Sequence, residues 1–123
     1  MNLEPITHEL DRMAGTPGIV GCALVEAATG LVWHTSGHAP TGERVWEAAI
    51  DYWRLHERQK EHFTVLGPLG AAVMYHARGV LAVLPCSTDP EVLVVTSAAH
   101  RGVDWTAWQR RVRALGGLMQ RAA

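Results

Sequence analysis

Three stretches of the chain repeat apolar residues every three or four positions, the spacing of one face of an amphipathic helix. The first covers residues 1–14, the second runs from Glu43 to about Lys60, and the third follows Asp104. Thr41 and Asp104 are residue types that commonly cap a helix N-terminus, so we expect them to cap the second and third helices. The repeat of the first helix consists of Leu3, Ile6, Leu10 and Met13.

Between these helices, short runs rich in β-branched residues predict five strands. The first two are joined by a turn at Thr29 and Gly30 and form a hairpin, while the last three form an antiparallel meander that ends in an almost wholly apolar, central strand. Pro68 removes a backbone N–H donor near the start of the third strand, so its pairing is expected to begin only after Gly70. The predicted strands cover residues 19–26, 31–35, 65–76, 80–84 and 92–96.

The composition indicates one domain, residues 1–123, with a single hydrophobic core. The chain has 123 residues, of which 48% are hydrophobic and 19% charged, and its net charge is -1. A nearly neutral chain gives no electrostatic basis for binding nucleic acid or an anionic membrane. The uncharged run at residues 13–25 contains glycine and proline, and the first residues lack a signal-peptide pattern. We therefore expect a cytoplasmic protein with no membrane insertion.

The element order and several motifs resemble the roadblock/dynein light chain family. The resemblance rests on the glycine-bearing first strand at residues 18–25, the turn into residues 30–32, the Leu-Gly pair at 66–67 and the Asp-Pro pair at 89–90. It implies a profilin-like α+β fold of order α-β-β-α-β-β-β-α, with a five-stranded antiparallel sheet in the order 2-1-5-4-3. The long middle helix would lie on one face and the terminal helices on the other. It also implies a homodimer, or a heterodimer with a sibling roadblock protein, that docks or regulates a small Ras-like GTPase or a larger assembly.

The middle helix carries more apolar surface than a helix on one sheet requires. Its apolar residues span about 220° of the helical wheel, whereas roughly 100° suffices for packing on a sheet. Other parts of the same chain could cover the excess, but a second copy covers it more simply, together with the edge of the third strand. The dimer interface predicted in this way consists of Trp46, Ala49, Ile50, Trp53, Ala71, Val73 and Tyr75.

The third helix carries an arginine stripe opposite its apolar face. Such a stripe is typical of a solvated helix surface, helped by the favourable position of cations near a helix C-terminus. The alternative is a docking face for an acidic partner. The pattern favours the solvated surface. The stripe consists of Arg110, Arg113 and Arg121.

No set of residues forms a catalytic or metal-binding pattern. His34 and His38 are four apart but fall on a strand and a loop, and the sequence contains no HExxH or CxxC pattern. Cys86 has no base placed against it, and its apolar surroundings disfavour the thiolate. We therefore expect no enzyme activity, no metal and no cofactor. The alternative function is a small-ligand sensor of the PAS or profilin-like type, although bulky residues in the sheet argue for a filled core.

Cys22 and Cys86 are expected to remain free thiols. In the sheet order that the resemblance implies, Cys22 lies in the first strand and Cys86 at the end of the fourth, with the fifth strand between them. Two strand spacings of about 4.8 Å place their Cα atoms roughly 10 Å apart. This separation exceeds the reach of a disulfide.

Overall fold

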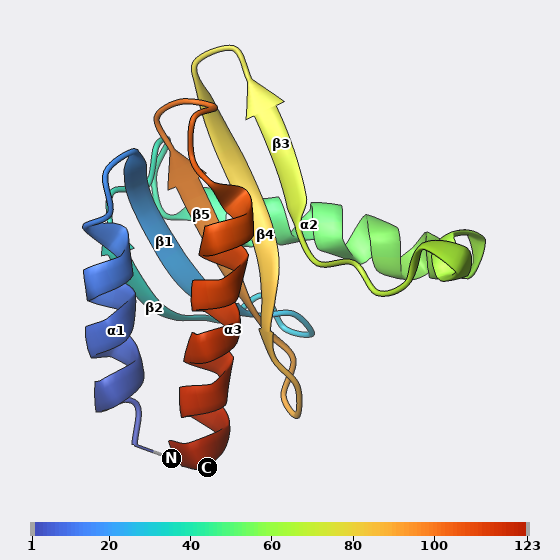
Figure 1. The fold of residues 1–123 in the computed structure, drawn as a ribbon, viewed down its shortest axis with the longest axis horizontal. Coiled ribbons are helices and arrows are strands. Elements are labelled where there is room, and N and C mark those ends of the chain that lie inside the picture. Colours follow the sequence, from blue (N-terminus) through green and yellow to red (C-terminus); the bar gives the residue numbers. More distant parts are fainter. Residues whose placement is uncertain (1, 123) are drawn as a thin grey trace.

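The computed structural model describes residues 2–122 (Figure 1). Its element order is the predicted one, with a short 3-10 helix, η1, added after the middle helix. The helices are α1 (Glu4–Ala14), α2 (Arg44–Gln59), η1 (Lys60–Leu66) and α3 (Trp105–Ala122). The strands are β1 (Ile19–Glu26), β2 (Val32–Gly37), β3 (Ala72–His76), β4 (Gly79–Ser87) and β5 (Val92–Ala98). No helix in this described part is both long and apolar enough to cross a bilayer.

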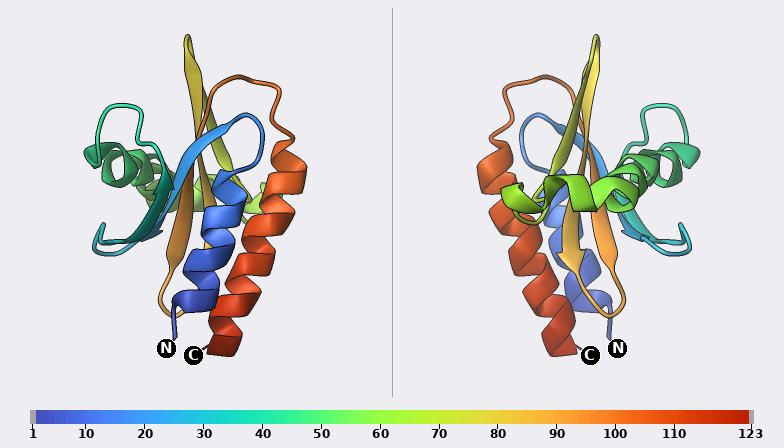
Figure 2. Two further views of the ribbon diagram at one scale, coloured as in Figure 1. Left: turned by 90° about the vertical axis from the view of Figure 1, so that its left-hand side faces the viewer. Right: turned by 90° about the vertical axis from the view of Figure 1, so that its right-hand side faces the viewer.

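One antiparallel sheet holds the strands in the order β2-β1-β5-β4-β3, which confirms the predicted topology. β5 lies at its centre, and every residue of this strand is buried. Because successive side chains of a strand point to opposite faces, Val92 and Val94 join one core while Leu93 and Val95 join the other. Figure 2 shows the resulting layers, with α1 and α3 side by side on one face of the sheet and α2 on the other.

The terminal helices pack against the sheet through one apolar stripe each. Asp104 caps α3 as predicted, because its Oδ1 accepts a hydrogen bond of 3.0 Å from the backbone N–H of Ala107. Trp108 Nε1 donates a hydrogen bond of 2.9 Å to Thr96 Oγ1, which satisfies both buried polar groups. The buried residues of the two helices are Ile6, Leu10, Met13, Trp108, Val112, Leu115, Gly116 and Met119.

The middle helix α2 packs on the opposite face of the sheet. Arg54 fixes its position by donating hydrogen bonds of 3.3 and 3.1 Å, from Nε and Nη2, to the carbonyl oxygen of Ala27. The predicted cap at Thr41 is wrong: Glu43 precedes the helix, and no side chain caps its first turn. Gly42, with φ of +105°, turns the chain before the helix begins and separates Thr41 from the exposed N–H groups. The buried residues of α2 are Trp46, Ala49, Ile50 and Trp53.

The third strand is shorter than its predicted extent of residues 65–76. Pairing begins at Ala72, beyond Pro68, as the missing backbone donor predicts. Residues 60–66 form η1 instead of the start of the strand. Gly67 then has φ of +80°, a conformation that favours glycine and directs the chain from η1 back toward the edge of the sheet.

At Gly116, α3 approaches β4 closely. A Cβ at this buried position would collide with the backbone carbonyl of Cys86, which belongs to β4 and cannot move aside without disturbing the sheet. The substitution Gly116→Ala should therefore lower the free energy of unfolding by about 1–3 kcal/mol, despite the better helix propensity of alanine. Urea denaturation followed by circular dichroism, at one protein concentration, measures this change.

Gly117→Ala is the matched control for this prediction. A Cβ at Gly117 would have Arg121 Nη1 as its nearest neighbour, at 3.5 Å, which is an ordinary contact with a flexible side chain. The control should raise the free energy of unfolding by about 0.5–1 kcal/mol, because alanine is the better helix former. Equal effects of the two substitutions would contradict the close contact between α3 and β4.

Candidate functional site

β3 is the last strand of the sheet, and one of its edges has no partner strand within residues 2–122. Alternate side chains of this strand face the two helical layers: Val73 packs with the α1/α3 core, while Ala72 and Met74 pack with the α2 core. Tyr75 is exposed, and the Arg101 guanidinium carbon lies 4.6 Å from its ring centre. The edge therefore presents backbone N–H and C=O groups, already in strand conformation, to another chain.

The structure brings only part of the predicted interface to the surface. Tyr75 of β3 is exposed, whereas Val73 of β3 and Ala71, which precedes the strand, are half-buried. The α2 residues of the set are at most 4% exposed, because they fill the core between the helix and the sheet. The premise that some of these α2 side chains cannot reach the sheet is therefore wrong, since the indoles are long enough to pack inward from the sides of the helix. These α2 residues are Trp46, Ala49, Ile50 and Trp53.

The exposed apolar surface lies elsewhere on α2 and on η1. Tyr52 and Leu55 are 46% and 51% exposed, and Val65 and Leu66 are 92% and 79% exposed. The sequence pattern missed the exposure of Val65 and Leu66, because it assigned both residues to a strand over residues 65–76. In Figure 1 the end of α2 and the whole of η1 extend past β3, beyond the edge of the sheet. We call the following exposed residues the apolar ridge: Tyr52, Leu55, Phe63, Val65 and Leu66.

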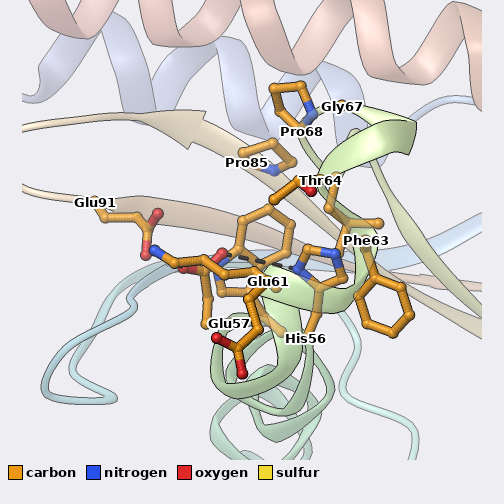
Figure 3. Close-up of a pocket in the computed structure, with 12 residues that line it drawn as sticks. His56, Glu57, Glu61, Phe63, Thr64, Gly67, Pro68, Pro85 and Glu91 are labelled. Atoms are coloured by element: carbon orange, nitrogen blue, oxygen red, sulfur yellow. Dashed lines mark ion pairs between the residues drawn. The ribbon is translucent and has the colours of Figure 1, made fainter.

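A hollow of about 640 Å³ lies between α2, η1 and the adjoining ends of β4 and β5 (Figure 3). His56 and Phe63 stack along it, with ring centres 5.3 Å apart. His56 Nδ1 is 3.9 Å from Glu57 Oε1, and neither this nitrogen nor the buried Trp53 Nε1 has a hydrogen-bond partner in the described part of the chain. A polar ligand could form hydrogen bonds with the ring nitrogens of His56 and Trp53. The described lining contains no nucleophile that is hydrogen-bonded to a base.

A second hollow, which we call the groove, lies on the α2 face of the sheet, where β4 begins and β5 ends. Its volume is about 750 Å³. Leu81 of β4 and Ser97 of β5 line it and pair with each other across the two strands. They share the face of Val83 and Val95, which lie two residues along and belong to the α2 core. Arg78, in the turn between β3 and β4, lies at its rim.

The arginines of α3 have two different surroundings. Arg111 turns toward α1 and the turn that follows it: Nη1 donates a hydrogen bond of 2.6 Å to Thr16 Oγ1, and Nη2 lies 3.9 Å from Glu9 Oε1. The three arginines of the predicted stripe are exposed instead, on the side of α3 away from the sheet. Those three are Arg110, Arg113 and Arg121.

Cys22 and Cys86 are free thiols that pack in the α1/α3 core. Cys22 Sγ lies 3.8 Å from the carbonyl oxygen of Leu10, and Cys86 Sγ lies 3.6 Å from Met119 Sδ. Burial raises the pKa of both thiols to about 12. Neither thiol is therefore a nucleophile at neutral pH.

His34 and Asp11 form a pair that joins β2 to α1, with 3.0 Å between Nε2 and Oδ1. The hydrogen bond from His34, followed by one from Ser36, holds the pKa of the Asp11 carboxyl below its ordinary value. Within residues 2–122, no group of three or more His, Cys, Asp or Glu side chains is placed to hold a metal ion. The pair is thus best understood as a contact between two elements of the fold.

Comparison with known proteins identifies the fold. No protein-family model matches the sequence, and no curated protein is significantly similar to it. A roadblock/LC7 domain structure from Streptomyces avermitilis matches with a TM-score of 0.75 and 16% identity, over 99% of this chain and 98% of that one. MglB from Myxococcus xanthus matches with a TM-score of 0.77 and 12% identity, over 100% and 96% of the two chains.

A further structure, of MglB with a tetrameric arrangement, matches with a TM-score of 0.75 and 18% identity, over 98% of this chain and 91% of that one. The matches therefore extend over nearly the whole chain and over nearly the whole of each solved structure. At these identities the similarity establishes the architecture rather than an activity. The chain has the roadblock fold.

Proposed function

We propose that the protein is a non-enzymatic adaptor that works as a dimer, either of two copies or with a sibling roadblock protein. The observation that carries this proposal is the free edge of β3 beside the apolar ridge of α2 and η1. An edge strand in a sheet is a template for another strand, and natural proteins usually block it by charge, proline or a covering segment. From Ala72 to His76 this edge contains no proline.

The apolar ridge supplies the energetic argument for a partner. Covering a side chain such as Val65 or Leu66, now 92% and 79% exposed, contributes roughly 1.5–3 kcal/mol when burial is complete. Tyr52 and Leu55 add further exposed apolar area on α2. Large exposed apolar surfaces are uncommon on monomers and mark interaction sites.

A two-fold symmetric dimer would pair the β3 edge and cover the apolar ridge in one interface. Antiparallel pairing of β3 with β3 of a second copy would place the axis at the middle of the strand, near Met74, and would join the two sheets edge to edge. The α2 helices of both copies would then lie on the same face of the joined sheet. Each copy would present the same surface to the other, as an isologous contact requires.

The partner of this dimer is proposed from the roadblock resemblance, which implies a small Ras-like GTPase or a larger assembly in the cytoplasm. The mechanism would be binding alone: a rigid joined sheet and its helices would favour one conformational state of the partner. The buried thiols, with pKa values raised to about 12, and the lack of a base beside any nucleophile in the described hollow support a role without chemistry.

A small-ligand sensor is the second candidate, and one observation favours it. The hollow beside η1 is lined by Trp53 and His56, and the buried ring nitrogens of these residues, Nε1 and Nδ1, have no hydrogen-bond partners in the described chain. A bound polar molecule could satisfy them. Mass spectrometry of the protein under non-denaturing conditions distinguishes the candidates, because a sensor purified from its native cell should carry a stoichiometric small molecule and an adaptor should not.

The dimer is tested by light scattering behind a sizing column, which should give twice the mass of one chain at micromolar concentration. The double substitution Tyr52→Glu and Leu55→Glu places charges in the proposed contact and should weaken association at least about a hundredfold, or roughly 3 kcal/mol. Because both side chains are about half exposed, the variant should remain folded.

Leu31→Glu is the matched control. Leu31 is 60% exposed beside the opposite edge of the sheet, so this substitution should leave the dimer intact. Ile50→Glu should instead unfold the chain, because Ile50 is fully buried. A wild-type protein that remains monomeric and soluble at high concentration would refute the proposed function.

The arginine stripe yields a separate prediction. The double substitution Arg110→Glu and Arg113→Glu should change the free energy of unfolding by less than about 1 kcal/mol, because exposed charges contribute little to stability. If the stripe is only a solvated surface, tagged wild-type and variant proteins should recover the same partners, including a GTPase, from the native cell at low and high salt. Loss of that partner from the variant would make the stripe its docking face.

A further inference from the structure

The groove has an apolar floor that neither core of the protein uses. Val20 of β1 and Leu81 of β4 line it and are half-buried, yet they belong to neither the α1/α3 core nor the α2 core. Val45, in the first turn of α2, adds an apolar wall. Because apolar side chains stabilise a complex when they are removed from water, this floor favours a ligand with an apolar part.

A buried hydroxyl group interrupts the apolar floor. Ser97 of β5 is 4% exposed and lines the groove beside its cross-strand partner Leu81. The neighbouring buried hydroxyl, that of Thr96, accepts a hydrogen bond from Trp108 Nε1 on the other face of the sheet. The Ser97 hydroxyl forms no hydrogen bond within residues 2–122. Since buried polar groups are normally hydrogen-bonded, this hydroxyl favours a ligand that brings a polar atom to the floor.

The rim of the groove carries a positive charge. Arg78, in the turn between β3 and β4, is exposed, and it takes part in no ion pair within the described residues. The described lining contains no aspartate or glutamate. Arg78 precedes Leu81 by three residues, or roughly 10 Å along an extended strand. A long arginine side chain and a bound carboxylate can together span the distance from there to Ser97.

The start of α2 adds to the positive potential. No side chain caps this helix, and Thr41 and Val45, which flank its first residue, both line the groove. The N–H groups of a first helical turn carry a partial positive charge that favours anions. The acidic residues of this region, Glu43 and Glu47, lie outside the lining, and Glu47 is turned toward Gly30.

We propose that the groove binds a small organic acid that carries an apolar chain. One carboxylate oxygen would accept a hydrogen bond from the Arg78 guanidinium and the other from the Ser97 hydroxyl, beside the start of α2. The apolar chain would cover Leu81, Val20 and Val45. The volume of about 750 Å³ lies within the range of small-molecule sites, roughly 300–1,000 Å³. This inference goes beyond the proposed adaptor function and does not depend on the dimer.

Other occupants would match the groove less well. A cation would meet Arg78 and the start of α2 with no acidic side chain in the described lining to receive it. An inorganic anion would leave Leu81 in water. The apolar ridge of a second copy would cover Leu81, but its apolar side chains would give the Ser97 hydroxyl no acceptor.

The experiment is a titration of nitrogen-15-labelled protein with octanoate, followed through the backbone amide signals by NMR spectroscopy. The signals of Arg78, Leu81 and Ser97 should shift together and reach saturation at one octanoate per chain. Octylamine has a similar chain with the opposite charge, and acetate has the charge without the chain. Neither should produce a saturable shift of these three signals.

Substitutions locate the carboxylate. Arg78→Glu should raise the dissociation constant for octanoate at least about tenfold, because hydrogen bonds to charged groups contribute this much or more. Ser97→Ala should weaken binding as well, and the variant should stay folded because the hydroxyl has no partner in the described chain. Arg113→Glu is the matched control: it makes the same change of charge at an exposed position on α3, on the other face of the sheet, and should bind octanoate as the wild type does.

The outcomes separate this inference from the proposed function. Saturable shifts that are lost in Arg78→Glu and kept in Arg113→Glu would support the groove site, even in a protein that light scattering shows to be a monomer. Equal binding of octylamine, equal loss in both variants, or saturation only at other signals would overturn the inference. Groove signals that shift with protein concentration and not with octanoate would identify a second copy as the occupant and would also overturn it.

Discussion

Every residue of the central strand β5 is buried, so both faces of the sheet must be covered. Its side chains alternate between two cores, so each face of the sheet must be covered by helices. The terminal helices cover one face, where Gly116 allows α3 to approach β4 closely. α2 alone covers the other, and its two tryptophans fill the width that a second helix would otherwise occupy.

This unequal cover has a consequence at the edge of the sheet. A single helix on the α2 face leaves the start of β4 and the end of β5 open, where the groove lies. The same helix continues through η1 past β3, where Val65 and Leu66 have no sheet of their own chain to cover. Exposed apolar side chains beside an unpaired strand edge are the surface that a second copy would cover in the proposed dimer.

Periodicity in the sequence is sufficient to predict most of the elements. The stripes of α1 and α3, the β1–β2 hairpin and the apolar β5 are strong local patterns, and Pro68 correctly predicts that β3 pairs only beyond it. The sheet order comes from the resemblance rather than from the patterns, because local spacing does not specify which strands become neighbours.

The site is less predictable, for two physical reasons. An apolar arc of about 220° on α2 does not reveal which part faces the sheet, and the structure turns the tryptophans inward and leaves Tyr52 and Leu55 outside. Val65 and Leu66 resemble the start of a strand because they are apolar and β-branched or bulky. The charged residues Lys60 and Glu61 are the local signal that this segment lies in solvent.

Hydrogen exchange of the β3 amides tests the central claim most directly. Alternate N–H groups from Ala72 to His76 point away from β4, and in an isolated chain these groups face water. Edge pairing predicts that they exchange slowly at concentrations where the protein has twice the chain mass, and that dilution to the monomer removes this protection. Rapid exchange of the outward N–H groups in a protein that is fully dimeric would contradict the account.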